Sequence, residues 1–316
     1  MNPPAAIRLE NLSHSYGRRQ ALCELSLEIA SGEIFVFLGP NGGGKTTLFR
    51  VLSTLIPQQS GTVEILGLNL RRDTTEIRRR IGVVFQAPSL DRKLTIAENI
   101  HQQAALYGLF GAELRHRRDE LLDQFALKDR AGERVEKLSG GLRRRVELAK
   151  GMIHRPELLL LDEPSTGLDP GARADLWEYL QRARQESGVT IVLTTHLLEE
   201  ADESDRIAIL NEGQLVALDT PDALRSSVGG DLIVIESAAP DELAAGLRSR
   251  LSLPAQVVEG TVRLETPEGH QWVARIVEEF PGSVGAIRLG KPTLEDVFIA
   301  RTGHRFWRER QEAAHA

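Results

Sequence analysis

Residues 39–46 read Gly39-Pro40-Asn41-Gly42-Gly43-Gly44-Lys45-Thr46 and fit the pattern G-x-x-x-x-G-K-[ST]. The apolar run 34–38 precedes this loop, and the helix-like run 48–52 follows it. In this context the backbone N–H groups of the loop wrap phosphates, and the helix N-terminus adds a partial positive charge. A glycine-rich turn that binds nothing is the alternative, and the lysine, the threonine and both flanking runs argue against it.

The loop therefore predicts binding of a nucleoside triphosphate. Lys45 is expected to reach the β- and γ-phosphates, and the hydroxyl of Thr46 is expected to ligate Mg²⁺. The predicted nucleotide contacts in this part of the chain are Gly39, Pro40, Asn41, Gly42, Gly43, Gly44, Lys45, Thr46 and Thr47. The loop alone indicates an NTPase and does not say of which family.

Composition limits the kind of protein. The 316 residues suffice for one large and one small domain, and the net charge of -6 gives no reason to expect a nucleic-acid partner. Cys23 is the single cysteine, so no internal disulfide is expected. We expect no signal peptide from the N-terminal sequence, and no apolar run approaches the roughly 20 residues that span a bilayer. Work at a membrane would need a membrane-embedded partner.

The first 220 residues alternate between strand-like and helix-like stretches. Strands are predicted at 34–38, 81–85, 158–161, 190–194 and 207–210. Three of these runs are apolar throughout, as expected of strands that are covered on both faces, which predicts an α/β layer with a mostly parallel sheet. Residues 88–150, approximately, have many charges and helical spacing, and we interpret them as an inserted helical subdomain.

A second domain is predicted after the glycine pair at 229–230. The pattern beyond it indicates the order β-α-β-β-α-β, which resembles a split βαβ, ferredoxin-like arrangement. The predicted division is a nucleotide-binding domain at 1–228, an accessory α+β domain at 229–303 and a charged tail at 304–316. The tail mixes aromatic and basic residues; a solvated tail is the default interpretation and contact with a membrane surface is the alternative.

Two acids end a strand of four leucines at 158–161. Asp162, delivered to the end of a buried strand, suits a Mg²⁺ ligand or a residue just behind one. Glu163 is placed to activate an attacking water as a general base. A pair of surface acids is the alternative, and the leucines before it argue against that interpretation.

A second anion site is predicted about 20 residues upstream of the acids. Ser139, Gly140 and Gly141 form an N-capped helix start. One domain has no evident need of two such sites for one triphosphate. A head-to-tail dimer does, because each nucleotide is then held by the loop of one chain and the glycine pair of the other.

With these motifs the sequence resembles the ABC ATPase family over residues 7–225. The markers occur in family order: Tyr16, the loop at 39–46, Gln86, the signature at 138–142, Asp162, Glu163, the D-loop at 165–169 and His196. Taken singly, Tyr16 would be ordinary packing and His196 a histidine at a strand end. Their joint order is what carries the resemblance.

The resemblance implies roles for the remaining markers. Tyr16 would stack on adenine, and Asp169 of the D-loop would contribute to the nucleotide site. Gln86 would lie near Mg²⁺ and take part in catalysis, and His196 would promote attack on the γ-phosphate together with Glu163. ATP and Mg²⁺ are the implied cofactors.

Two further segments resemble the daunorubicin-resistance-type exporter group. One is 290–298 followed by Thr302-Gly303, and the other is 197–202 after the histidine. The signature also departs from the commonest form, which ends in Gln, because this one ends in Leu142 and is followed by three arginines. An apolar residue there is similar to the same exporter group.

The resemblance implies an ATP-hydrolysing exporter subunit in the cytoplasm, peripheral on the inner face of the membrane. Integral membrane permease subunits would be its partners, and the working pair of nucleotide-binding domains would be a homodimer or a heterodimer. The alternative is a non-transport ABC ATPase of repair or translation. Those relatives usually carry a long coiled coil or tandem nucleotide domains, and neither pattern occurs here. The transported substrate stays open.

Overall fold

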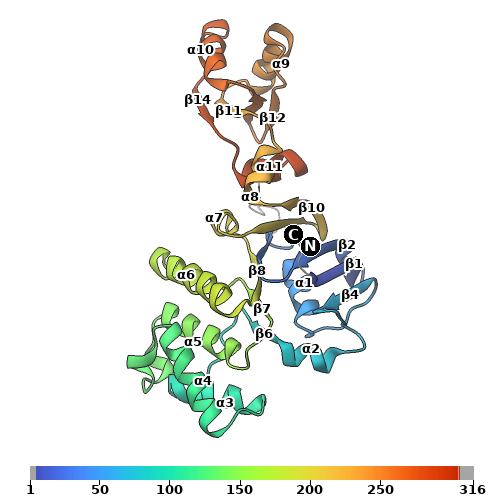
Figure 1. The fold of residues 1–316 in the computed structure, drawn as a ribbon. Coiled ribbons are helices and arrows are strands. Elements are labelled where there is room, and N and C mark those ends of the chain that lie inside the picture. The colour runs from blue at the N-terminus through green and yellow to red at the C-terminus, as the bar shows by residue number, and fades with distance from the viewer. Residues whose placement is uncertain (1–4, 305, 307–316) are drawn as a thin grey trace, which may run out of the picture. The chain divides into compact units, whose positions relative to one another are not determined.

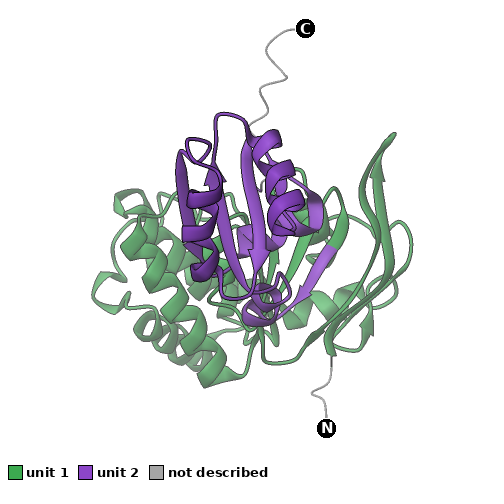
Figure 2. Ribbon diagram, turned by 90° about the horizontal axis from the view of Figure 1, so that it is seen from above, with its two compact units in different colours: residues 1–215 green, residues 216–316 purple. Residues whose placement is uncertain are grey.

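The computed structural model describes residues 5–304 and 306 and contains two compact units, 1–215 and 216–316 (Figure 2). The division falls inside a strand, whereas the predicted boundary at 228/229 falls between a helix and the next strand. That boundary stays a prediction. Most of the predicted charged tail lies outside the described residues.

A six-stranded sheet is the centre of the first unit. Its order is β10-β9-β3-β8-β7-β6, and the pairs among β6, β7, β8, β3 and β9 are parallel. The strands are β3 (Ile34–Leu38), β6 (Ile81–Val84), β7 (Leu158–Asp162), β8 (Thr190–Thr195), β9 (Arg206–Asn211) and β10 (Gln214–Asp219). Every residue of β3, β7 and β8 is buried. The predicted strands and parallel sheet are therefore confirmed, with ends shifted by a residue or two.

A second, antiparallel sheet of order β2-β1-β4-β5 was not predicted. Its strands are β1 (Ala5–Tyr16), β2 (Arg19–Ala30), β4 (Thr62–Ile65) and β5 (Leu68–Asn69). Leu25, Leu27 and Ile29 of β2 are buried and alternate with exposed residues. Apolar residues at every second position are typical of a strand whose sheet has one face exposed to solvent, and the sequence of β2 contains this pattern.

The helices of the first unit follow the expected alternation. They are α1 (Lys45–Leu52), α2 (Thr74–Arg80), α3 (Ile96–Leu106), α4 (Gly111–Gln124), α5 (Gly140–Met152), α6 (Pro170–Ser187) and α7 (Leu198–Ala201). Helices α3, α4 and α5 occupy the segment predicted as helical and lie together (Figure 1). A capping box of Thr95 and Glu98 starts α3.

The second unit has the predicted order of elements. They are α8 (Pro221–Ser226), β11 (Asp231–Glu236), α9 (Pro240–Leu251), β12 (Gln256–Val258), β13 (Thr261–Thr266), α10 (Gly269–Glu279), β14 (Ala286–Gly290) and α11 (Leu294–Thr302). The sheet order β12-β13-β11-β14 is antiparallel throughout. Ile233, Ile235, Leu247 and Ile276 are among the side chains that form its core. The ferredoxin-like expectation is confirmed.

Within residues 5–304, no helix combines the length and the apolar character that crossing a bilayer requires.

Candidate active site

The glycine loop turns from the end of β3 into the start of α1. Gly44 is the residue before α1 and has φ 104, a conformation that favours glycine. A Cβ at Gly39 would lie 2.3 Å from the carbonyl oxygen of Leu210 on the neighbouring strand β9. The loop therefore needs glycine at 44 for its backbone angle and at 39 for its close packing on the sheet.

A cavity of about 320 Å³ opens over this loop. It is lined by Tyr16, Arg19, Ala21, Asn41, Gly42, Gly44, Lys45, Thr46, Thr47 and Glu163. The structure thus gathers the predicted aromatic, most of the predicted loop and the predicted base around one space. Arg19 and Ala21 line it as well, and sequence reasoning did not name them.

Lys45 is buried beneath the loop and is only 4 % exposed. Its Nζ donates to the carbonyl oxygens of Gly39 at 2.7 Å and Pro40 at 3.1 Å, and it lies 3.9 Å from Oε1 of Glu163. Burial lowers the pKa of Lys45, while the charges of Glu163 and Asp162 oppose that shift. The ammonium group is thereby fixed at the point where the loop meets the acids.

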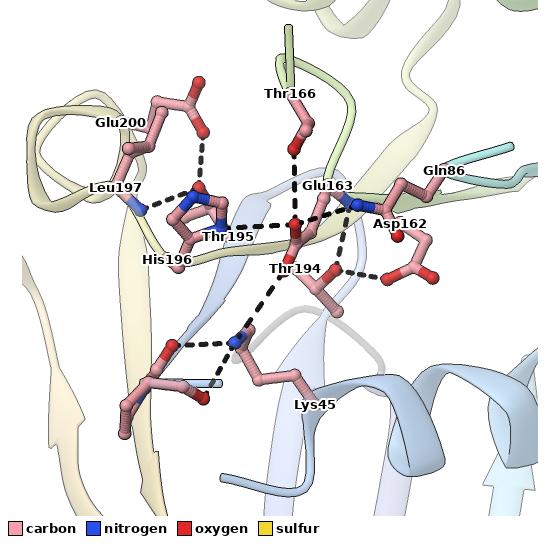
Figure 3. Close-up of polar contacts among 12 residues, drawn as sticks. Lys45, Gln86, Asp162, Glu163, Thr166, Thr194, Thr195, His196, Leu197 and Glu200 are labelled. Atoms are coloured by element: carbon pink, nitrogen blue, oxygen red, sulfur yellow. Dashed lines mark hydrogen bonds and ion pairs between the residues drawn. The ribbon is translucent and has the colours of Figure 1, made fainter. Parts of the chain in front are cut away.

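Glu163 is the centre of the polar contacts in this site (Figure 3). Its Oε2 accepts from Gln86 Nε2 at 3.3 Å and from Thr166 Oγ1 at 3.2 Å, and it lies 3.2 Å from Nδ1 of His196. Gln86 follows β6, His196 follows β8 and Thr166 comes from the turn after β7. The ends of three strands therefore bring Gln86 and His196, which are far from Glu163 in sequence, into contact with the same carboxylate oxygen of Glu163.

The backbone of Glu163 is also unusual. Its φ of 43 lies in the left-handed region, where a residue with a side chain is held at a cost in energy. Its N–H donates to the carbonyl oxygen of Thr194 at 3.1 Å and to the hydroxyl of the same residue at 3.0 Å. Strand β8 thus holds the conformation that turns this carboxylate toward the cavity.

Asp162 lies at the end of β7 and is 8 % exposed. Its Oδ1 accepts from Thr194 Oγ1 at 2.7 Å. Burial raises the pKa of Asp162 and the neighbouring charge of Glu163 adds to this, while the hydrogen bond from Thr194 and the charge of Lys45 oppose it. A cation beside it would relieve that penalty.

The signature and D-loop residues lie elsewhere in the chain's fold. The side chain of Ser139 accepts from the N–H of Leu142 at 3.3 Å and caps α5, and Asp169 accepts from the N–H of Ala172 at 2.9 Å and caps α6. Ser139, Gly140, Gly141 and Asp169 do not line the cavity. One chain therefore assembles only part of the set of residues predicted to contact nucleotide.

Several residues that hold the predicted site residues in place were not predicted from the sequence. Thr194 and Thr166 hold Glu163, and Thr195 donates to Glu200 at 2.5 Å while accepting from the N–H of Leu197 at 3.0 Å. The last two contacts brace the turn that carries His196. Threonines are common at strand ends, and nothing in the sequence distinguishes these from others.

Comparisons with known proteins identify the family. The family model described as ABC transporter matches residues 22–166. The daunorubicin resistance ATP-binding protein DrrA2 of Streptomyces coeruleorubidus is 39% identical over 95% of this chain and 96% of its own. The Nod factor export ATP-binding protein I of Sinorhizobium fredii is 39% identical over 94% of this chain and 86% of its own.

Solved structures show the same fold. The cbiO1 protein of Clostridium perfringens, described as part of the ABC transporter complex cbiONQ, has a TM-score of 0.66 at 26% identity and covers 78% of this chain and 96% of its own. A dimeric ATP-binding cassette bound to ADP and Pi has a TM-score of 0.61 at 29% identity, over 68% of this chain and 98% of its own. Given relatives this similar along nearly the whole length, the chain belongs to the ATP-binding, ATP-hydrolysing subunits of the ABC transporter family.

Proposed function

We propose that this chain drives export by hydrolysing ATP and passing the resulting movement to separate integral membrane permease subunits. The contact set around Glu163 carries the catalytic half of the proposal, because it joins a buried lysine, a glutamine and a histidine at the edge of one cavity. The relatives named for drug resistance and for Nod factor export support the transport half. Neither name belongs to repair or translation, so the non-transport alternative is not favoured.

The residues that line the cavity support the proposal that it binds a nucleoside triphosphate. Tyr16 has 46 % of its surface exposed and offers a ring face for adenine at the rim. The loop at 39–44 leads into the N-terminus of α1, and its free backbone N–H groups are proposed to hold the phosphates there, with Thr47 in the first turn of the helix. Lys45 supplies the positive charge nearest the acids.

Mg²⁺ is proposed to lie among Thr46, Gln86 and Asp162. These side chains offer a hydroxyl, an amide and a carboxylate, which are the oxygen donors that this hard cation prefers, with phosphates and waters completing its shell. The raised pKa of the buried Asp162 fits a position that is stabilised by a nearby cation. When bound, the ion would neutralise charge that develops on the phosphates.

Hydrolysis follows from the position of Glu163. Its carboxylate accepts a proton from the attacking water as the new P–O bond forms and the bond between the β–γ bridging oxygen and the γ-phosphorus breaks, which releases ADP and phosphate. His196 is proposed to hold the water or the γ-phosphate in line, since its ring lies beside the carboxylate. Gln86 and Thr166 keep the same oxygen oriented.

A second chain is proposed to complete the site. Ser139, Gly140 and Gly141 form a helix start that is partly exposed and lies outside the cavity, and Asp169 caps the next helix, α6. In a head-to-tail dimer these residues would close over the nucleotide of the partner. The dimeric cassette among the solved relatives supports this arrangement, and both a homodimer and a heterodimer satisfy it.

The proposed location is the cytoplasm, at the inner face of the membrane beside the permease. The proposed domains are 1–228 for nucleotide binding, with a helical subdomain at about 88–150, and 229–303 as an accessory domain. We propose that the accessory domain serves in structural support, in dimer contact or in regulation. No nucleic acid is expected as a partner of the chain.

The test is Glu163→Gln. We expect hydrolysis to fall on the order of 10²-fold or more, because the amide cannot accept the proton. Binding of ATP and ATP-dependent dimerisation should persist. Steady-state phosphate release, equilibrium binding of a fluorescent ATP analogue and size-exclusion chromatography measure the three quantities. Glu199→Gln, an exposed acid after β8, is the matched control, and near-normal hydrolysis by Glu163→Gln would overturn the assignment.

A further inference from the structure

Helix α5 begins with the signature and continues with three arginines that have three different partners. Arg143 donates to the carbonyl oxygen of Leu138 at 2.5 Å, back toward the start of its own helix. Arg145 pairs with Asp175 on α6 and lies 4.9 Å from the ring centre of Tyr179. Only the middle arginine points toward the acids, so the three offer a comparison within a single turn.

Arg144 reaches the two backbone segments that carry the reacting side chains. Its Nη1 donates to the carbonyl oxygen of Phe85 at 3.0 Å, and its Nη2 lies 3.5 Å from the carbonyl oxygen of Glu163. Phe85 immediately precedes Gln86, and the side chains of Gln86 and Glu163 meet at 3.3 Å. One guanidinium group therefore joins the backbones directly behind the Gln86–Glu163 contact.

The same helix holds the other end of the segment after β6. Glu147 is 4 % exposed and accepts from Ser89 N at 2.6 Å and from Ser89 Oγ at 2.9 Å. Lys150 donates to Ser89 O at 2.6 Å and to Ser89 Oγ at 2.9 Å. Residues 85–89 are thus attached to α5 at both ends, with Gln86 between the two attachments.

We propose that Arg144 is a positioning residue for ATP hydrolysis, which sets Gln86 against Glu163 and makes their alignment depend on the position of the signature helix. The inference rests on the proposed roles of Gln86 and Glu163. On this proposal, a displacement of α5 shifts Gln86 relative to Glu163 through the guanidinium group of Arg144, and not through loop contacts alone. The first residues of α5 are exposed, so a partner chain can contact them.

The chemistry of arginine suits this task. A planar guanidinium presents several N–H donors in a fixed fork, so it can hold two carbonyl oxygens at a set separation, whereas an ammonium group is a point donor on a flexible stem. Arg144 is 9 % exposed, and burial lowers its pKa while Glu147 and Asp162 oppose that shift. Because the N–H groups of this buried guanidinium donate to two backbone carbonyl oxygens, they fix the relative position of those oxygens more closely than an exposed charge would.

The experiment compares Arg144→Gln with Arg143→Gln and Arg145→Gln in the full chain. We expect Arg144→Gln to lower kcat on the order of tenfold or more, with KM for ATP and the Kd of a fluorescent ATP analogue changed less than about threefold. The two controls should stay within about threefold in kcat. Arg144→Lys should recover part of the loss, because one carbonyl can still be held.

A double variant tests whether Arg144 acts through Gln86. Arg144→Gln combined with Gln86→Ala should lose less kcat than the product of the two single losses, since the residues share one effect. Multiplicative losses would overturn the inference, as would a rise in KM with kcat unchanged, or equal losses in all three arginine variants. Thermal unfolding and nucleotide binding report folding, and if Arg144→Gln fails to fold, Arg144→Lys against wild type carries the same kcat and KM comparison.

Failure of the inference is distinguishable from failure of the proposed function. If Glu163→Gln abolishes hydrolysis and Arg144→Gln behaves like its neighbours, only the inference falls. If Glu163→Gln hydrolyses ATP normally, the proposed function falls first.

Discussion

Thr194 shows how much the positions of two acidic residues depend on one uncharged side chain. Its hydroxyl donates to Asp162 and accepts from the N–H of Glu163, so it orders both acids at once. The sequence places Thr194 in a buried strand and gives no sign of this double contact. The acids could be predicted because their chemistry is explicit, whereas their supports are ordinary residues that only three-dimensional proximity reveals.

The first prediction at this scale is Thr194→Val. The substitution removes the hydroxyl from a buried site, leaving an acceptor of Asp162 without its donor, and we expect a loss of about 1–3 kcal/mol in the free energy of unfolding. Hydrolysis should fall as well, because Glu163 loses one of the two contacts of its N–H. Urea unfolding and phosphate release measure these effects, and Thr194→Ser, which retains the hydroxyl, should restore most of the activity.

His154 gives a prediction about pH. It stacks on Tyr107 with ring centres 3.7 Å apart, and its Nε2 lies 3.0 Å from the carbonyl oxygen of Ile81. Burial lowers its pKa from 6.5 to about 4. Above pH 6.5 the ring is neutral in both the folded and the unfolded chain, so it has no effect on the pH dependence of stability there. As pH falls from 6.5 toward 4 the unfolded chain binds the proton first, and stability is lost.

The expected loss in the free energy of unfolding is large enough to be measured by urea unfolding. A shift of this extent corresponds to about 3 kcal/mol when pH has fallen to 4. Urea unfolding at pH 7.5 and pH 5 should show wild type losing more stability than His154→Phe, which keeps the aromatic stack and removes the titration. Equal losses in both proteins would contradict the assignment to this histidine.

Among the elements, those buried on both faces are the ones that sequence predicts best. Strands β3, β7 and β8 are continuous apolar runs, and a run of that kind with a turn at each end has few alternatives. The sheet of β1 and β2 was missed because its strands are apolar mainly at every second residue and so lack the continuous apolar runs that mark β3, β7 and β8. Several register shifts in the pairing of β1 with β2 weaken the period further.

The start of α3 provides the prediction at the scale of an element. Thr95 Oγ1 accepts from the N–H of Glu98, whose carboxylate accepts in turn from the N–H and hydroxyl of Thr95. Thr95→Ala should cost about 1 kcal/mol of stability, and Thr95→Ser should cost less because its hydroxyl keeps the cap. Thermal unfolding of the two variants beside wild type checks the order, and equal destabilisation would contradict a role for the cap.

At the scale of the whole molecule, the proposed site lies within one unit. Every residue lining the cavity lies between Tyr16 and Glu163, and His196 also precedes residue 215. We therefore expect a chain truncated after Val228 to bind a fluorescent ATP analogue with a Kd within a few-fold of the full chain. Circular dichroism establishes that the truncated chain is folded, and a folded chain that binds no nucleotide would contradict this expectation.

The turn between β12 and β13 has a practical consequence for work on this protein. Glu259 and Gly260 are exposed and have φ values of 47 and 79, so the hairpin closes through the two-residue geometry that suits the twist of its strands. Exposed hairpin tips are where inserted sequence is best tolerated. An epitope or a fluorophore attached at this tip would label the second unit, while all the side chains proposed to handle ATP lie in the first.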